Sequence, residues 1–151
     1  MTPPPPLAIA AASMLSGYLD GETAPLIDGH YLTGDLGVLN EHGALKITGR
    51  LKLLIEIGGR KVNPAEVEAV LCEHPAVGAC VVLPMRLSET VCRLKAIVTP
   101  ARPGMELPAQ DLRRFARERL SGYKVPRIFE VREALPTSPS GKVLRRLVES
   151  Q

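Results

Sequence analysis

Residues 54–75, LIEIGGRKVNPAEVEAVLCEHP, hold two strong local structure signals side by side. Short apolar runs flank a Gly-Gly pair, and a glycine pair in such a place is typical of a tight β-hairpin. Asn63 then suits the N-cap of a helix, Pro64 suits its first position, and Glu66 suits the acidic position of a capping box. The stretch therefore predicts a hairpin that leads directly into a helix.

The predicted helix has Val67, Val70 and Leu71 as its buried stripe, and Pro75 ends it. Two apolar runs that follow, VGACVVL and RLKAIVT, have the length and composition of buried core strands. We therefore expect the helix to pack on a sheet that contains both runs.

A second amphipathic helix is predicted over AQDLRRFARERL, with Leu112, Phe115 and Leu120 facing inward. IFEV is typical of one more strand, and a closing helix is expected after Lys142. In the first part of the chain, LAIAAAS, GHYLTGDLG and GALKITG are typical of strands, and turn residues at 40–43 predict that the last two form a hairpin. This order of elements predicts an α+β fold, with helices packed on a small mixed sheet after a β-rich start.

Charge is distributed unevenly along the chain, although its net value is only +3. The first 45 residues hold five acidic side chains and neither Lys nor Arg, so the remainder carries all 19 basic residues against 11 of the 16 acidic ones. The later part is therefore expected to meet anions. Nucleic acid is not the expected anion, because aromatic residues make up only 3% of the chain and no nucleic-acid-binding motif occurs.

The three cysteines and three histidines are scattered, without the spacing of a metal site or of a disulfide framework. Such cysteine usage is typical of the reducing cytoplasm, which is the expected location. No apolar run reaches the length of about 18 residues that a membrane span needs. No Lys or Arg precedes Lys46, so the apolar stretch LAIAAASML lacks the charged start of a signal peptide.

Residues 135–142, LPTSPSGK, place a single lysine after a glycine on a loop that two prolines stiffen. A cation just before a helix opposes the helix dipole, so the arrangement indicates that an anion binds there. A phosphate-binding P-loop is excluded, because Pro136 and Val143 occupy the positions of its first glycine and of its Ser or Thr.

Five segments that follow one another along the chain carry a family resemblance. They are YLTGD (31–35), GRLKLLIEIGGRKVNPAEVE (49–68), HPAV (74–77), GYKVP (122–126) and LPTSPSGKVLRR (135–146). In this order they resemble the carboxyl-terminal portion of the adenylate-forming ligases, which include acyl-CoA and aryl-CoA synthetases, luciferases and the adenylation domains of peptide synthetases. The resemblance implies that a carboxylic acid is joined to AMP from ATP, and that its acyl group then passes to the thiol of coenzyme A or of the phosphopantetheine arm of an acyl carrier protein.

The resemblance also implies roles for single residues on the nucleotide side of the reaction. Lys142 matches the lysine of the adenylation step, whose ammonium neutralises charge at the reacting phosphate and carboxylate. Asp35 matches a ribose-binding aspartate, whose two oxygens can accept both sugar hydroxyls. Arg50 matches a position beside the nucleotide, and Lys52 matches the hinge about which the small domain rotates.

On the thiol side, Gly58 and Gly59 match a hairpin that lets phosphopantetheine approach the active site, since glycine places no side chain in its path. A plain tight turn is the alternative interpretation of this pair. Arg60 and Lys61, which follow it, are candidates for attracting the phosphates of coenzyme A.

By the same resemblance, residues 1–51 correspond to a stub of the large AMP-binding domain and residues 52–151 to the mobile C-terminal small domain. The sequence has no Ser/Thr/Gly-rich phosphate loop, and in relatives the acid pocket and the Mg²⁺ site belong to the large domain. We therefore expect that this chain alone does not adenylate an acid. Because unpaired strand edges invite association, the stub is expected to be disordered, exchanged between chains through self-association, or supported by the small domain.

A second class of function stays open at this point. The chain could be a free-standing, non-catalytic module that binds a carrier protein or a separate large subunit, and binding without turnover would distinguish it from part of a ligase. A nucleic-acid binder is the third alternative, and its affinity would fall steeply with salt.

Overall fold

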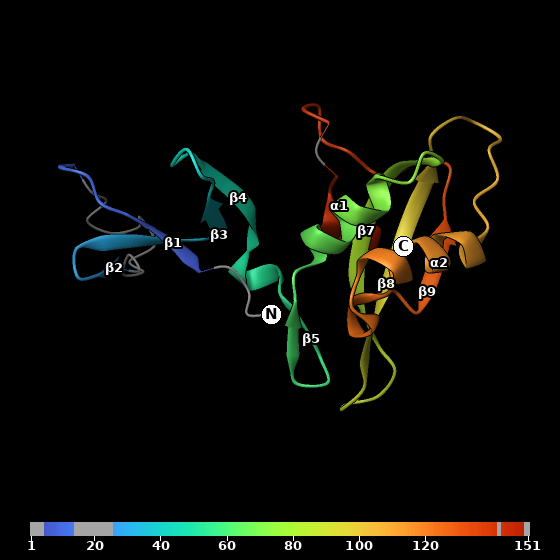
Figure 1. Cartoon of the computed structure of the whole chain (residues 1–151), viewed down its shortest axis with the longest axis horizontal. Coiled ribbons are helices and arrows are strands. Elements are labelled where there is room, and N and C mark those ends of the chain that lie inside the picture. The colour runs from blue at the N-terminus through green and yellow to red at the C-terminus, as the bar shows by residue number, and fades with distance from the viewer. Residues whose placement is uncertain (1–4, 14–25, 142, 150–151) are drawn as a thin grey trace. The chain divides into compact units, whose positions relative to one another are not determined.

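Two units, Met1–Leu54 and Ile55–Gln151, make up the chain in the computed structural model, which describes residues 5–13, 26–141 and 143–149 (Figure 1). The described residues of the first unit form a four-stranded antiparallel sheet in which β3 pairs with each of the other strands. The predicted hairpin of residues 29–49 is confirmed as the β3–β4 pair, and the first predicted strand is confirmed over a shorter range. The elements of this unit are β1 (Pro6–Ile9), β2 (Leu26–Ile27), β3 (His30–Leu39), β4 (Leu45–Arg50) and the short 3₁₀-helix η1 (Leu51–Leu53).

The first unit leaves much of its apolar surface open. Leu36 is buried, with 1% of its surface exposed, but Ile27, Leu39 and Ile47 are 57%, 69% and 62% exposed. Isolated apolar residues are common on protein surfaces, whereas several on one small sheet are typical of a surface that another part of a protein covers.

The second unit contains the predicted hairpin, helices and core strands in the expected order. Its three-stranded sheet has the order β7-β8-β9, with β7 and β8 antiparallel and β8 and β9 parallel, so the sheet is mixed. The predicted α+β fold is thereby confirmed. The elements are β5 (Ile55–Ile57), β6 (Arg60–Val62), α1 (Pro64–Cys72), β7 (Val77–Arg86), β8 (Cys92–Pro100), α2 (Ala109–Arg119), the 3₁₀-helix η2 (Gly122–Lys124), β9 (Ile128–Val131) and α3 (Arg145–Glu149).

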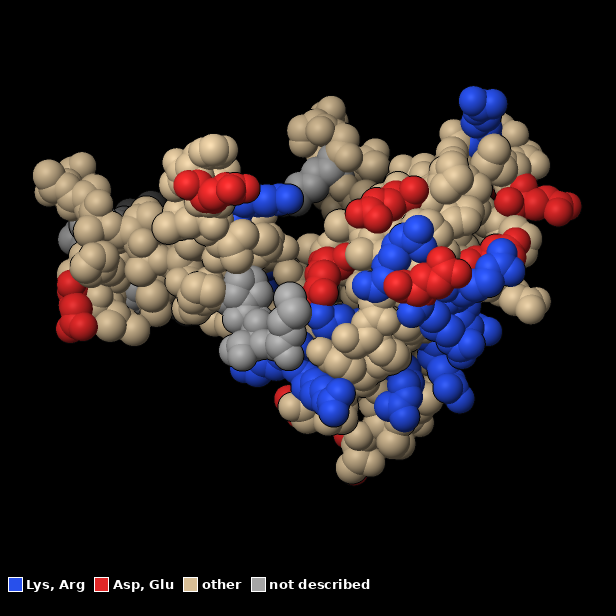
Figure 2. All heavy atoms as spheres, in the orientation of Figure 1, with Lys and Arg blue, Asp and Glu red and all other residues tan. Residues whose placement is uncertain are grey.

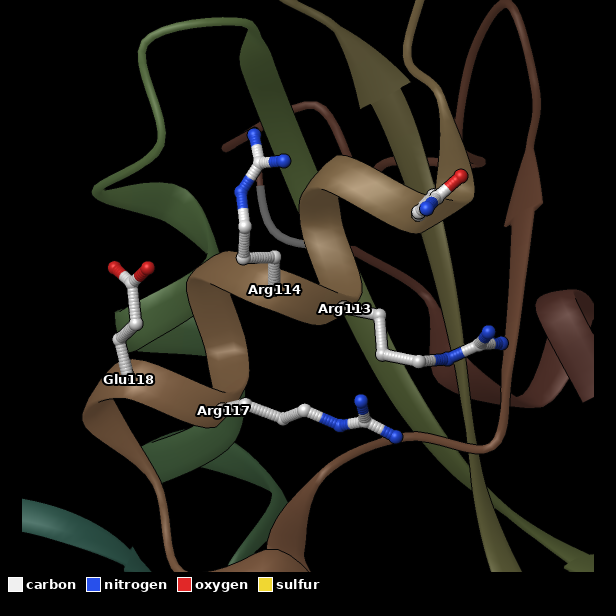
Figure 3. A pocket seen from close by; sticks show the side chains of 5 residues that line it. Arg113, Arg114, Arg117 and Glu118 are labelled. Atoms are coloured by element: carbon white, nitrogen blue, oxygen red, sulfur yellow. The ribbon is translucent and has the colours of Figure 1, made fainter.

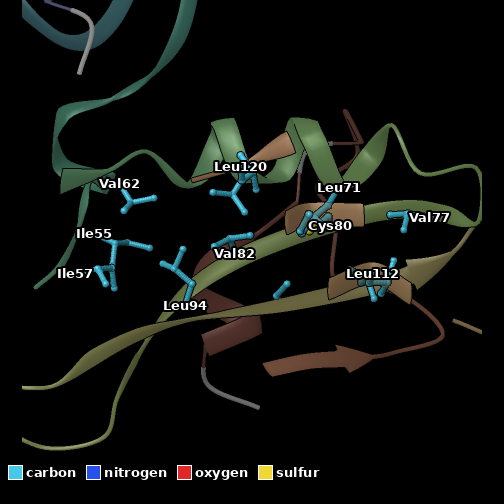
Figure 4. Close-up of a cluster of buried hydrophobic side chains, with 14 of the residues drawn as sticks. Ile55, Ile57, Val62, Leu71, Val77, Cys80, Val82, Leu94, Leu112 and Leu120 are labelled. Atoms are coloured by element: carbon cyan, nitrogen blue, oxygen red, sulfur yellow. The ribbon is translucent and has the colours of Figure 1, made fainter. Parts of the chain in front are cut away.

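Both faces of this sheet are covered, which explains why its strands read as continuous apolar runs. On one face, Cys80 and Val82 of β7 belong to the large core cluster, which also takes in buried residues of α1, α2 and the β5–β6 hairpin (Figure 4). On the other face, Val81 and Leu83 pack in a smaller cluster with Val148 of α3. The hairpin is therefore anchored to the core, and its turn is held at a defined place.

The N-cap and the first position of α1 are confirmed as predicted. Asn63 is its N-cap and accepts a hydrogen bond from the Ala65 amide at 3.1 Å, and Pro64 is the first helical residue. Val67 and Leu71 are fully buried, while Val70 is only partly buried against the same cluster.

Two details of the helices differ from the sequence-based expectation. Phe115 of α2 is only partly buried, because its ring packs edge-on against His74 at 4.9 Å and under the Arg119 guanidinium at 3.7 Å. The closing helix begins at Arg145 rather than directly after Lys142, because Val143 pairs with Thr137 in an isolated β-bridge.

Glu130 links the parallel strands β8 and β9, since its carboxylate pairs with Lys95 and, at 2.5 Å, with Arg132 Nε. Hydrogen bonds from Lys95 and Arg132 lower the pKa of Glu130 below its ordinary value of 4.5. Because the pKa of Glu130 is lowered in the folded state, the pairing stabilises the fold fully at pH values above the ordinary pKa of 4.5. This stabilisation is lost as the pH falls through the lower, folded-state pKa.

We therefore expect Glu130→Gln to lower the free energy of unfolding at pH 7 by up to about 1 kcal/mol, the range of partly exposed ion pairs. The difference from the unchanged chain should shrink as the pH falls below 4.5. Urea denaturation between pH 7 and about pH 3 measures it, with the exposed Glu133→Gln as control. A difference that stays constant over this range would contradict the assignment.

Candidate functional site

Asp35 and Arg50 face each other across the β3–β4 pair and form an ion pair, with 2.8 Å between Asp35 Oδ1 and Arg50 Nε. Gly34 bends the chain just before Asp35 with a φ of 74°, in the left-handed region that favours glycine. The Asp35 amide donates to Thr33 Oγ1 at 3.1 Å. The Asp35 side chain is 18% exposed and that of Arg50 is 64% exposed. The strand pair thus brings together the two residues expected on the nucleotide side.

The chemistry of this pair fits a nucleoside phosphate. An ionised carboxylate accepts hydrogen bonds at both oxygens, and the contact with Arg50 Nε is made by Oδ1 of Asp35. A carboxylate has several acceptor positions, so it can also accept from the neighbouring hydroxyls of a ribose. The exposed Arg50 guanidinium beside it is suited to a phosphate oxygen.

Lys52, the expected hinge residue, lies in η1 with an exposed side chain. The first unit ends two residues later, at Leu54. A solvated side chain next to a unit boundary is the environment that a rotating segment needs.

The turn between β5 and β6 consists of Gly58 and Gly59 alone, since Ile57 pairs with Arg60. Both glycines have positive φ, 55° and 76°, as the twist-compatible two-residue hairpin turn requires. Among the described residues beyond its two chain neighbours, a Cβ atom at either position would meet no atom within 4 Å. Backbone conformation, rather than crowding, is therefore what requires glycine here.

A groove of about 390 Å³ opens beside this turn, within the second unit. Gly58 and Arg60 form one side, Arg93 of β8 lines it, and Tyr123 and Arg127 come from the segment after α2. The Arg60 guanidinium lies over the Tyr123 ring at 4.8 Å. Three guanidinium groups and a phenol around one groove are suited to a phosphate and an adjoining polar chain.

Sequence reasoning missed three of these groove residues. Arg93, Tyr123 and Arg127 lie far from Gly58 in the sequence, and they come together only through the pairing of β8 with its neighbours and the return of the chain after α2. The GYKVP segment, which contains Tyr123, is one of the segments that carry the family resemblance, but the sequence predicts no ligand-binding role for its residues. Arg60, which was predicted, lines the groove, whereas Lys61 does not.

Lys142 lies outside the described residues. On either side of it, Thr137 and Val143 form a β-bridge, and the Leu144 amide donates to the Pro136 carbonyl oxygen at 2.8 Å. The segments before and after position 142 are therefore joined to each other at the base of the loop.

Basic side chains gather on one face of the second unit, where Lys and Arg outnumber acidic residues (Figure 2). The surface of helix α2 in this unit has a hollow. Figure 3 shows that Arg113 and Arg117 extend on the same side of the helix. In the part of the chain that the structure describes, α2 supplies every residue that lines the hollow, so no second described element encloses a ligand there. The hollow is therefore typical of a solvated helix face. The lining residues are Gln110, Arg113, Arg114, Arg117 and Glu118.

Within residues 5–13, 26–141 and 143–149, no group of three or more His, Cys, Asp or Glu is placed to hold a metal ion. Among the described helices, none combines the length and the apolar character needed to cross a membrane.

Comparison with known proteins places this chain in a family. Residues 66–142 match the family described as AMP-binding enzyme C-terminal domain. The long-chain-fatty-acid–CoA ligase of Bacillus subtilis is 37% identical over 143 residues, which are 93% of this chain and 25% of that protein. The fatty acid–[acyl-carrier-protein] ligase of Streptomyces coeruleorubidus is 37% identical over 130 residues, 86% of this chain and 25% of that protein.

Among solved structures, o-succinylbenzoate CoA synthetase from Bacillus subtilis, in complex with the acyl-adenylate intermediate OSB-AMP, matches with a TM-score of 0.70 and 35% identity. The match covers 82% of this chain and 25% of that one. The chain belongs to the adenylate-forming ligases and contains their AMP-binding enzyme C-terminal domain. It spans about a quarter of the length of these relatives.

Proposed function

We propose that the chain acts as the C-terminal part of a ligase that activates a carboxylic acid with ATP and transfers the acyl group to a thiol. In the first step, the carboxylate attacks the α-phosphorus of ATP and pyrophosphate leaves. In the second step, the thiol sulfur attacks the acyl carbonyl, loses its proton, and AMP leaves. Family membership and the arginine-lined groove beside the Gly58 turn support this assignment.

On the nucleotide side, Lys142 is the proposed catalytic residue of adenylation. Its ammonium would neutralise the charge that develops as the carboxylate and the α-phosphate meet. Asp35 would bind the ribose hydroxyls, and Arg50, which already pairs with Asp35, would hold the adjoining part of the nucleotide.

On the thiol side, the groove is the observation that carries the proposal. A phosphopantetheine arm, whether part of coenzyme A or attached to a carrier protein, presents a phosphate and a narrow polar chain. Arg60, Arg93 and Arg127 offer donors for the phosphate, and the Gly58 turn leaves the edge of the groove free of side chains. ATP and the phosphopantetheine thiol are therefore the proposed co-substrates.

A large AMP-binding domain is the proposed partner, and it would supply the acid pocket, the phosphate loop and the Mg²⁺ site. The exposed apolar residues of the first unit suit contact with such a domain, since Ile27, Leu39 and Ile47 are each more than half exposed. Lys52 is the proposed hinge residue. Unpaired thiols at all three cysteines suit the reducing cytoplasm as the place of action.

Acid-dependent ATP–pyrophosphate exchange tests this function. The 151-residue chain alone should show none, and the chain joined to a large AMP-binding domain of the family should show it with at least one acid of a panel. Exchange by the chain alone would contradict the assignment of the acid pocket and the phosphate loop to a separate large domain. Capture of a carrier protein by a joined protein that turns over no acid would favour the alternative of a non-catalytic binding module.

The role of the groove leads to a separate prediction. Arg127→Ala removes one guanidinium from the groove, so we expect the KM for coenzyme A or the carrier protein to rise about tenfold, the value of one charge-assisted hydrogen bond. The rate of ATP–pyrophosphate exchange should stay within about twofold. Arg86→Ala, an exposed arginine of β7 that does not line the groove, is the control. If the two variants had equal effects on this KM, the groove would have no role in binding the thiol substrate.

A further inference from the structure

Helix α1 uses two acidic side chains, Glu66 and Glu68, to hold two separate segments of the second unit. Residues two positions apart on an α-helix point about 200° apart around its axis. Glu66 contacts Lys124, in η2 after the second helix, and Glu68 contacts Arg145, at the start of α3. The two ion pairs therefore lie on different sides of one helix.

The Glu66–Lys124 pair supports a wall of the groove. Lys124 Nζ donates to both carboxylate oxygens of Glu66, at 2.6 and 2.8 Å, and the Lys124 side chain is only 9% exposed. The residues before and after Lys124, Tyr123 and Val125, both line the groove. A buried ammonium needs its partner, so this pair fixes the backbone from which Tyr123 projects.

The Glu68–Arg145 pair ties the segment after Lys142 to the sheet. Arg145 Nη2 contacts both oxygens of Glu68, at 2.5 and 2.6 Å, and Arg145 Nη1 donates to the Val82 carbonyl oxygen at 3.0 Å. The Val82 amide donates to Glu68 Oε1 at 2.7 Å. Since β7 is an edge strand of its sheet, the pair also satisfies backbone groups that no neighbouring strand reaches.

Because the Glu68–Arg145 pair is largely buried, each of its two charges needs the other as a partner. Burial raises the pKa of Glu68, while the charge of Arg145 and the hydrogen bonds from Val82 and Arg145 oppose the rise. Removing Arg145 would leave a carboxylate with 15% of its side chain exposed and, among the described residues, no other ion-pair partner. The segment at residues 143–145 is thus held by a contact that tolerates little displacement.

We propose that α1 is a common support for both chemical steps: Glu68 and Arg145 position the segment next to Lys142 for adenylation, and Glu66 and Lys124 position the groove wall for thiol transfer. The four residues are positioning residues, since they act through the segments they hold. The chemical roles of the two segments rest on the proposed function. That each segment is held in place by its own ion pair does not depend on it.

Hydrogen exchange on the 151-residue chain tests the support itself. Arg145→Met should speed amide exchange about tenfold or more in peptides from 136–148, as expected for loss of charge-assisted hydrogen bonds, and leave 121–127 within about twofold. Lys124→Met should have the reverse effect. The exposed Arg146→Met and Lys61→Met are the controls. A common response of both segments to either variant, or no response, would overturn the proposal.

A milder variant decides the case in which Arg145→Met speeds exchange throughout the unit. Arg145→Lys keeps the charge opposite Glu68 but cannot reach both the carboxylate and the Val82 carbonyl as the guanidinium does. An increase confined to 136–148 supports the proposal, and a general increase or none overturns it.

Half-reactions of the chain joined to its large domain test the consequence. Arg145→Lys should lower the maximal rate of ATP–pyrophosphate exchange about 10²-fold, the effect of a small misplacement of a reacting group, with thioester formation from supplied acyl-adenylate within about threefold. Lys124→Met should raise the KM for the thiol acceptor about tenfold and spare exchange. Equal losses in both steps would overturn the division of labour. If the unchanged joined enzyme catalyses neither step, the proposed function fails, and the hydrogen-exchange pattern still decides the support.

Discussion

Lys142→Ala should slow acid-dependent ATP–pyrophosphate exchange by about 10² to 10³ in the proposed enzyme, in which this chain is joined to a large AMP-binding domain. This is the usual loss when one focused donor to the developing charge is removed, and it corresponds to about 2.7–4 kcal/mol of transition-state stabilisation. Because the proposed place of the ammonium is where the carboxylate and the α-phosphate meet, the maximal rate should fall more than the affinity for ATP.

Thioester formation from supplied acyl-adenylate is the internal comparison for this variant. The phosphoryl chemistry is complete before that step begins, so its rate should change far less. Arg146→Ala, which removes an exposed basic side chain of the following helix, controls for a general loss of positive charge. If Lys142→Ala impaired both steps equally, the residue would have no special role in adenylation.

Leu112→Ala should destabilise the second unit by about 2–5 kcal/mol, the range for truncating a fully buried leucine. Leu112 has no exposed surface and lies in the large core cluster, where α2 packs beside α1 and the sheet (Figure 4). Well-packed neighbours cannot collapse fully into the space that the side chain leaves. For a unit of this size, the melting temperature should fall by more than about 10 °C.

The unfolding of the second unit can be followed separately through the NMR amide signals of α2 and β7 in urea. Gln110→Ala is the matched control, because it replaces an exposed residue of the same helix and should change stability by less than about 0.5 kcal/mol. If the two substitutions lowered the free energy of unfolding by the same amount, the placement of Leu112 in the core between α2 and the sheet would be contradicted.

Features of the fold that depend on neighbouring residues were predictable from the sequence. The β5–β6 turn needs two residues with positive φ, and a Gly-Gly pair supplies them; the N-cap of α1 needs a side-chain acceptor next to Pro64, and Asn63 supplies it. Asp35 and Arg50 lie on two strands of one hairpin, so their meeting follows from a short turn. These signals act within a few residues and do not depend on the remaining chain.

Other features were not predictable, because they depend on which segments the topology brings together. Phe115 has the helical spacing of a core residue, yet His74 and Arg119 hold its ring at the surface. The closing helix begins at Arg145, since pairing of Val143 with Thr137 takes precedence over helical spacing.

The amino-acid sequence by itself determined the elements, the mixed α+β plan, and family membership, because caps, turns, apolar periodicity and motifs are written in adjacent positions. Only the tertiary structure decided which charges meet: Lys124 and Glu66 are 58 residues apart, and Arg145 and Glu68 are 77 residues apart. The guanidinium groups of the groove likewise come from separate strands and loops. The sequence does not indicate which charged residue pairs with which, because electrostatic attraction depends on distance in space. That distance is set only when the sheet and its helices have packed.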